Sequence, residues 1–157
     1  MNKPTVVHHT FSMERSLPVS PDHVFAAFST PDLKRHWFAG HGSHAAEEYS
    51  LDFQVGGKER VLSRMGQNTP FPGAPLLAES IHLDIVPNQR IVIAGSMTLN
   101  GHRFSAALAT FELLQTENGT DLLFTHQAAF FEGADGPEMR QAGWKALLDR
   151  LTEDLQP

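Results

Sequence analysis

Two side chains in this sequence are candidates for acid–base chemistry, His126 and Glu79. His126 lies in the alternating segment 119–131, where Asp121 is expected to face water, so that Phe124 and His126 face inward. An imidazole titrates near neutral pH, and in a mostly apolar cavity it could bind a ligand oxygen or act as an acid or base. The alternative is a structural histidine that hydrogen-bonds to a neighbouring backbone group.

Glu79 is expected on an inward-facing apolar stripe of the segment 76–86. The stripe consists of Leu77, Glu79, Ile81, Leu83 and Ile85. An unpaired carboxylate there would be costly, so Glu79 should pair with a basic side chain, bind a ligand, or reach water at the end of the strand. The basic candidates are Arg60, Arg64 and His126. If His126 and Glu79 converge in one cavity, they suit an enzyme of the cyclase or hydrolase kind, and we find no other catalytic constellation.

Aromatic side chains and one helical glycine are candidates for the wall of a cavity between a sheet and the last helix. The expected wall consists of Trp37, Phe38, Phe53, Glu79, Phe111, Phe124, His126, Gly143, Trp144 and Leu148. Core packing is the more common use of the aromatic residues. A glycine inside a helix costs about 1 kcal/mol relative to alanine, so Gly143 indicates either a cavity entrance or a close contact between helix and sheet.

Three histidines, His36, His41 and His44, form a loose cluster. Their spacing contains no helical i,i+4 pair and no acidic ligand at a fixed distance, so we expect no metal site. Phosphate-binding loops, nucleophile elbows and dinucleotide fingerprints are also absent from the sequence. We therefore expect no cofactor.

Composition narrows the function further. The 157 residues are 41% hydrophobic and carry a net charge of −6, which fits one globular domain over 1–157. The negative charge and the lack of a basic cluster argue against nucleic-acid binding. The chain has no cysteine, which excludes disulfides and thiolate chemistry. We see no signal peptide and no apolar run long enough to span a membrane, and we expect a cytoplasmic protein.

The elements that position these residues can be read from caps and alternation. The runs SPD (20–22) and TPD (30–32) each place a hydroxyl cap, a first-turn proline and an acid, which predicts helices at 21–29 and 31–38. A long amphipathic helix is expected at 137–155. Strands are expected at 8–17, 49–55, 58–65, 76–86, 89–98, 102–115 and 119–131, with a paired-glycine hairpin at 56–57 and a flexible flap at 66–75. The order βααββββββα predicts an α+β fold with an antiparallel sheet.

Six segments carry a resemblance to a known family. They are SPDHVFAA (20–27), KRHWFAG (34–40), DFQVGGKE (52–59), IVPNQRIV (85–92), GTDLLFTHQ (119–127) and AGWKALLDRL (142–151). With them the chain resembles the stand-alone bacterial homologues of the activator of heat-shock protein 90 ATPase, within the START-like (SRPBCC, polyketide cyclase-like) superfamily. The chain departs from the family pattern at His126, where similar sequences often carry Glu.

The resemblance implies a helix-grip fold, in which a curved sheet of about seven strands surrounds a long C-terminal helix and leaves an apolar cavity. A fold of this kind hosts several functions. Our first hypothesis is a protein that binds a small apolar or amphipathic molecule in the cavity. The alternatives are the enzyme that uses His126 and Glu79, and a regulator that binds a chaperone. Self-association is a further possible interaction.

Overall fold

The computed structural model describes residues 3–40 and 45–157. The described elements run in the predicted order βααββββββα. They are β1 (Val7–Leu17), α1 (Pro21–Ser29), α2 (Pro31–Phe38), β2 (Glu48–Leu51), β3 (Lys58–Arg64), β4 (Pro75–Val86), β5 (Arg90–Leu99), β6 (His102–Thr116), β7 (Gly119–Phe130) and α3 (Pro137–Asp154). Within the described ranges, no helix is long and apolar enough to cross a membrane.

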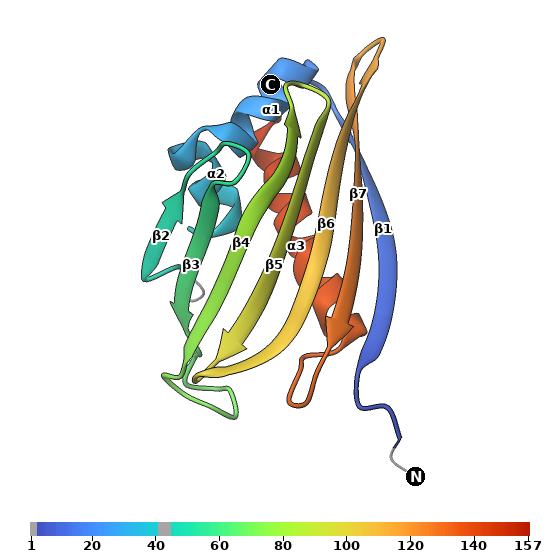
Figure 1. Cartoon of the computed structure of the whole chain (residues 1–157). Helices are drawn as coiled ribbons and strands as arrows, with labels where there is room; N and C mark the ends of the chain where they lie inside the picture. Colours follow the sequence, from blue (N-terminus) through green and yellow to red (C-terminus); the bar gives the residue numbers. More distant parts are fainter. Residues whose placement is uncertain (1–2, 41–44) are drawn as a thin grey trace.

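The strands form one antiparallel sheet in the order β1-β7-β6-β5-β4-β3-β2. The first two strands of the chain therefore lie at opposite edges, and α1 and α2 connect them across one end of the sheet (Figure 1). The sheet curves around α3, which crosses its concave face. This arrangement confirms the predicted helix-grip fold.

A core of large side chains fills one part of the interface between sheet and helices. Leu148 and Leu151 of α3 are fully buried in it. Trp37 of α2 is also fully buried, and its indole Nε1 donates a hydrogen bond to the carbonyl oxygen of Ala27 at 3.0 Å. Its ring lies edge-on to Phe28, with centroids 5.2 Å apart. Trp37 thus fixes α2 to α1 and to the sheet.

Glycines and asparagines set two of the tight turns. The β5–β6 hairpin turns through Asn100 and Gly101, with φ of 51° and 84°, as expected for an Asn-Gly pair. The turn between β2 and β3 is longer than the predicted two-residue hairpin, because β2 ends at Leu51 rather than near Val55. A β-carbon on Gly57 would lie 2.1 Å from the carbonyl oxygen of Asp52, so only glycine allows the chain to fold back there.

The two helix caps differ from the prediction. Neither Ser20 nor Thr30 makes a side-chain hydrogen bond to the helix that follows it. The hydroxyl of Ser20 instead donates to the carboxylate of Asp22. The helices begin at the predicted prolines nonetheless, because a proline at the first helical position is already in helical geometry and has no N–H that would be left unsatisfied there.

The segment between β3 and β4 has no regular structure, as predicted from its prolines and glycines. Its ends are joined by a hydrogen bond from the backbone N–H of Met65 to the carbonyl oxygen of Ala74, at 2.9 Å. The loop lies at the end of the sheet opposite α1 (Figure 1).

Candidate ligand cavity

A cavity of about 470 Å³ lies between the concave face of the sheet and α3. Its walls come from β3, β4, β5, β6 and β7 on one side, and from α3 and the end of α2 on the other. The volume is within the range of roughly 300–1,000 Å³ that is typical of pockets for small molecules. Most of the wall is apolar, and its charged side chains are Glu59, Glu79, Asp135, Arg140 and Arg150.

The cavity exists because small residues face one another across the interface. Those on the sheet are Ala78, Ser80, Gly95, Ser105, Ala107 and Ala109, and those on α3 are Gly143 and Ala146. A β-carbon on Gly143 would meet no atom within 4 Å, so this glycine borders open space. Gly95 is different, because a β-carbon there would lie 2.7 Å from the carbonyl oxygen of Glu79. The cavity is therefore bordered on both sides by residues with small side chains or none.

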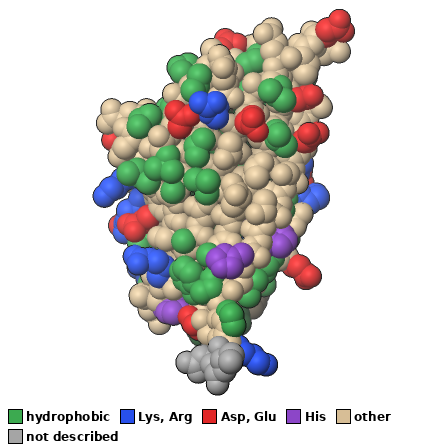
Figure 2. All heavy atoms as spheres, turned by 45° about the vertical axis from the view of Figure 1, so that its right-hand side comes forward, with side chains coloured by type: hydrophobic (Ala, Val, Ile, Leu, Met, Phe, Trp, Pro, Cys, Tyr) green, Lys and Arg blue, Asp and Glu red, His purple; other side chains and the backbone are tan. Residues whose placement is uncertain are grey.

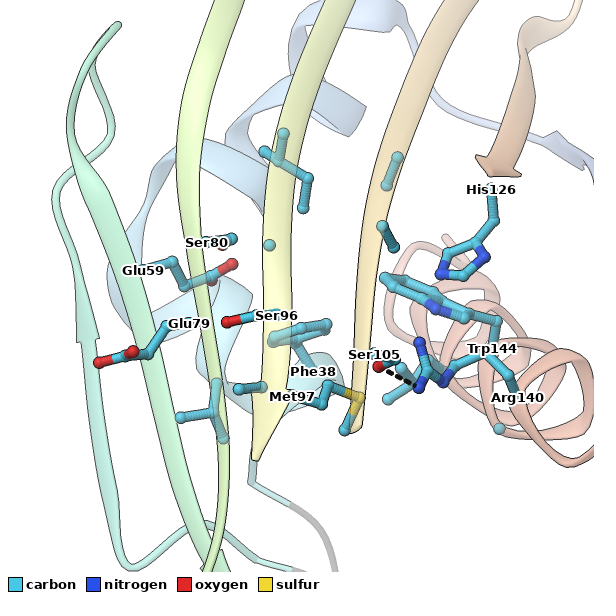
Figure 3. A pocket seen from close by; sticks show the side chains of 18 of the residues that line it. Phe38, Glu59, Glu79, Ser80, Ser96, Met97, Ser105, His126, Arg140 and Trp144 are labelled. Atoms are coloured by element: carbon cyan, nitrogen blue, oxygen red, sulfur yellow. Dashed lines mark hydrogen bonds between the residues drawn. The ribbon is translucent and has the colours of Figure 1, made fainter. Parts of the chain in front are cut away.

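Arg140, near the start of α3, provides the charged group at one end of the cavity. Its Nε and Nη2 donate to the two carboxylate oxygens of Asp135 at 2.8 and 2.9 Å. Nη2 also donates to the hydroxyl of Ser105 on β6 at 2.8 Å (Figure 3). The guanidinium lies 5.1 Å from the ring centroid of Phe130. These contacts hold the arginine in one orientation on the cavity wall.

His126 lies at the same end and is only 2% exposed. Its ring stacks on Phe11 of β1, with centroids 5.0 Å apart, and Figure 3 shows it above the indole of Trp144. Its Nδ1 has no hydrogen-bond partner among the described residues. Burial, and then the positive charge of Arg140, lower the pKa of His126 to about 4. The imidazole is therefore neutral at pH 7.

The other end is closed by a buried ion pair. Lys34 of α2 donates to both carboxylate oxygens of Glu59 on β3, at 3.0 and 2.9 Å. The hydroxyl of Tyr49 donates to the same carboxylate at 2.6 Å, and burial together with the charge of Glu59 raises the pKa of Tyr49. The ammonium group also lies 4.2 Å from the ring centroid of Phe38. Glu59 lines the cavity, but its oxygens already accept three hydrogen bonds.

The structure places half of the predicted cavity residues on the wall. These are Phe38, Glu79, His126, Gly143 and Trp144. The others, Trp37, Phe53, Phe111, Phe124 and Leu148, belong to the core or pack against it. The reason is size: large side chains fill the interface, and the cavity opens where side chains are small. Phe53 packs instead on Phe25 and His82, with ring centroids 5.5 and 5.1 Å away.

Glu79 does not occupy the predicted inward position. On β4 the concave face carries Leu76, Ala78 and Ser80, so Glu79 belongs to the opposite face and reaches only the border of the cavity. Its side chain is 51% exposed, lies 3.8 Å from Nε of Arg60, and points away from α3 in Figure 3. The apolar stripe with Leu83, which is exposed, faces outward. The prediction was wrong because it placed the larger apolar residues of β4 on the concave side, whereas small residues line that side.

The predicted acid–base pair is consequently not assembled. His126 is on β7 and Glu79 is on β4, three strand positions away in the sheet. At the usual spacing between strands this corresponds to roughly 14 Å. Sequence reasoning missed polar groups that do border the cavity, Arg140 with Asp135, and Glu59, whose partner is Lys34. Spacing along the sequence does not reveal these pairs, because the two residues of each pair come from different elements or from a loop.

Possible metal ligands do not cluster in the described part of the chain. Within residues 3–40 and 45–157 no group of three or more His, Asp or Glu side chains is arranged to hold a metal ion. His41 and His44, which the sequence groups with His36, lie outside the described residues.

A second depression, of about 480 Å³, lies on the outer face of β5, β6, β7 and β1. It is open to solvent, and Figure 2 shows few charged side chains in the middle of this face.

Comparison with known proteins decides the family. The chain matches the family described as "Activator of Hsp90 ATPase homolog 1-like protein" over residues 18–156. The chain belongs to this family. The match covers α1 through α3 and so includes all of the cavity wall. The predicted resemblance is thus confirmed.

Several solved structures share the same fold. The Mll3558 protein from Rhizobium loti is 39% identical, with 97% of this chain and 100% of that chain covered and a TM-score of 0.83. A protein from Rhizobium leguminosarum is 37% identical, with coverages of 96% and 95% and a TM-score of 0.88. An AHSA1-like protein from Aeromonas hydrophila is 18% identical, covers 92% and 90%, and has a TM-score of 0.66, which shows the fold alone. No functionally curated protein shows significant similarity to the chain.

Proposed function

We propose that the protein binds a small amphipathic molecule in the cavity between the sheet and α3. The observation that carries the proposal is the cavity itself, about 470 Å³ of space bordered by small residues from both walls. Protein interiors are normally packed as densely as organic crystals. A void of this size, next to a tightly packed core, is the arrangement expected where a ligand supplies the missing volume.

The distribution of polar groups supports an amphipathic ligand rather than a purely apolar one. The middle of the cavity is lined by residues such as Ile93, Ala109 and Leu147, whereas Arg140 and His126 lie together at one end. Ligand pockets commonly combine apolar walls with a few polar groups that fix the orientation of the molecule. The carbon skeleton would pack in the middle, and the polar group would lie at the α3 end.

The neutral fluorescent ligand N-phenyl-1-naphthylamine tests this proposal. We expect it to bind the wild-type protein with enhanced emission, and to bind the Gly143→Phe variant at least about tenfold more weakly, because the new ring occupies the open space beside the glycine. Gly143→Ala is the matched control, since it changes the same position and adds one methyl group. Equal binding by all three proteins, or no binding by the wild type, would refute a ligand site in the cavity.

A chaperone-binding role is the second candidate, and the family match favours it. Such a partner would contact the outer surface rather than the cavity. Its binding should therefore be the same for wild type and Gly143→Phe, which separates this role from ligand binding. A pull-down with a purified chaperone of the heat-shock protein 90 class, with both proteins compared, measures the difference.

A further inference from the structure

We propose that the polar end of the ligand is a carboxylate, which binds Nη1 of Arg140. This inference rests on the proposed function and deepens it, because it assigns a chemical class to the molecule in the cavity. The ligand would thus be an amphipathic carboxylic acid, with its carbon skeleton between the sheet and α3.

The hydrogen bonds of Arg140 leave one side of its guanidinium unused. A guanidinium has five N–H donors, and three of them are taken, one from Nε to Asp135 and two from Nη2 to Asp135 and Ser105. Nη1 has no partner among the described residues, although the side chain is only 8% exposed and lines the cavity. Arginine stays charged and cannot accept a hydrogen bond, so Nη1 is available to donate to an acceptor on the ligand.

His126 adds a second unpaired polar group at the same end. Its ring is buried on the cavity wall beside Trp144, and Nδ1 lacks a partner within the described part of the chain. A neutral imidazole has one N–H donor. The positive charge of Arg140 disfavours protonation of the ring, and an anion bound at Nη1 would offset that charge. A negatively charged ligand group at Arg140 would therefore change the electrostatic environment of the His126 ring.

A carboxylate matches this end of the cavity in number of acceptors and in charge. Its two oxygens can accept the two N–H groups of Nη1, and hydrogen bonds between charged groups of this kind are stronger than neutral ones. The Asp135 carboxylate occupies the opposite edge of the guanidinium, at Nε and Nη2. A doubly charged phosphate would meet the same few donors with more repulsion from Asp135. At the far end, Glu59 is saturated by Lys34 and Tyr49 and so offers no competing site for a cationic group.

Decanoate and 1-decanol, which share one carbon skeleton, test the inference by calorimetric titration. We expect the wild type to bind decanoate at least about tenfold more tightly than 1-decanol, because charged hydrogen bonds form only with the carboxylate. The double variant Asp135→Asn/Arg140→Gln should lose this preference while its net charge is unchanged. The matched control is Arg15→Gln/Asp149→Asn, the same exchanges in an ion pair that does not line the cavity, and it should keep the preference.

A measurement on the wild type alone covers the case in which the double variant fails to fold. The imidazole signals of His126 in NMR spectra should shift with decanoate and shift less with 1-decanol. Equal affinity for the two compounds, no binding of decanoate, or equal loss of preference in both double variants would overturn the carboxylate. If N-phenyl-1-naphthylamine still binds wild type and not Gly143→Phe in the same preparations, the proposed function stands and only the carboxylate assignment fails.

Discussion

At His126, burial and a neighbouring charge act in the same direction. Removal from water disfavours the protonated imidazole, and Arg140 disfavours it further, so that the folded-state pKa is about 4 compared with 6.5 for an unperturbed histidine. Stacking on Phe11 holds the ring in place without satisfying Nδ1. The protein therefore keeps an uncharged, incompletely hydrogen-bonded ring at the polar end of its cavity, which is the state suited to receive a ligand group.

This pKa predicts how stability depends on pH. Between about pH 6.5 and pH 4 the unfolded chain binds a proton at His126 that the folded chain does not, so the free energy of unfolding falls as the pH is lowered through this window. The loss from this one residue approaches roughly 3 kcal/mol near pH 4, and above about pH 6.5 the residue has no effect on the slope. Urea unfolding of wild type and His126→Phe at a series of pH values measures it.

The His126→Phe variant keeps an aromatic ring against Phe11 but cannot titrate. Its stability should fall less steeply than that of the wild type as the pH drops from about 6.5 to about 4, because both proteins share the titration of all other groups. Parallel curves for the two proteins would show that His126 is protonated in the folded state at these pH values. The account of a neutral imidazole would then be wrong.

Among the elements, α2 depends most clearly on a single side chain. Trp37 is fully buried, and its indole bonds to the carbonyl oxygen of Ala27 in α1. Trp37→Ala should lower the free energy of unfolding by roughly 3–5 kcal/mol, because it removes a large buried side chain and leaves a cavity. Trp37→Phe, which loses the N–H but keeps a ring, should cost less. Thermal unfolding of both variants checks the order, and a melting temperature for Trp37→Ala equal to that of wild type would contradict it.

The ion pair between Lys34 and Glu59 connects α2 to β3. Both side chains are buried, so Lys34→Met leaves the Glu59 carboxylate without its counter-charge and should cost about 3–5 kcal/mol. The double variant Lys34→Met/Glu59→Leu removes both charges and should recover much of that loss. Chemical denaturation of the single and double variants measures the difference. A double variant no more stable than Lys34→Met would contradict this account of the pair.

The elements also show which structural features the sequence can reveal. Helix starts and most strands follow from local signals, such as the prolines that begin α1 and α2 and the Asn-Gly turn after β5, and the predicted elements differ from the structure only by small errors in length. The inward face of β4 was predicted wrongly. Glu79 and its apolar neighbours form the more hydrophobic face of this strand, whereas the face with small side chains lines the cavity. Alternation reports average hydrophobicity, whereas a cavity is signalled by small residues such as Ala78 and Ala107 at inward positions.

At the scale of the whole molecule, the family match and the helix-grip fold account for the curved sheet that surrounds α3. His126, Gly143 and Trp144 line the cavity as predicted, because parity on β7 and periodicity on α3 are local properties. Groups such as Arg140 with Asp135 depend on tertiary contacts between α3, β6 and a loop, and no spacing in the sequence predicts those contacts. The same limit explains why large aromatic residues such as Phe111 and Phe124 were assigned to the cavity rather than to the core beside it.

The central claim is that a small molecule occupies the space between the sheet and α3. Methyl chemical shifts of alanines, recorded as N-phenyl-1-naphthylamine is added, test it most directly, because the aromatic rings of the ligand shift nearby methyl signals. Ala78 and Ala146 line the cavity from its two walls, whereas Ala94 and Ala129 lie in the depression on the outer face. The account predicts large shifts for the first pair and small shifts for the second. Shifts confined to Ala94 and Ala129, or to neither pair, would contradict it.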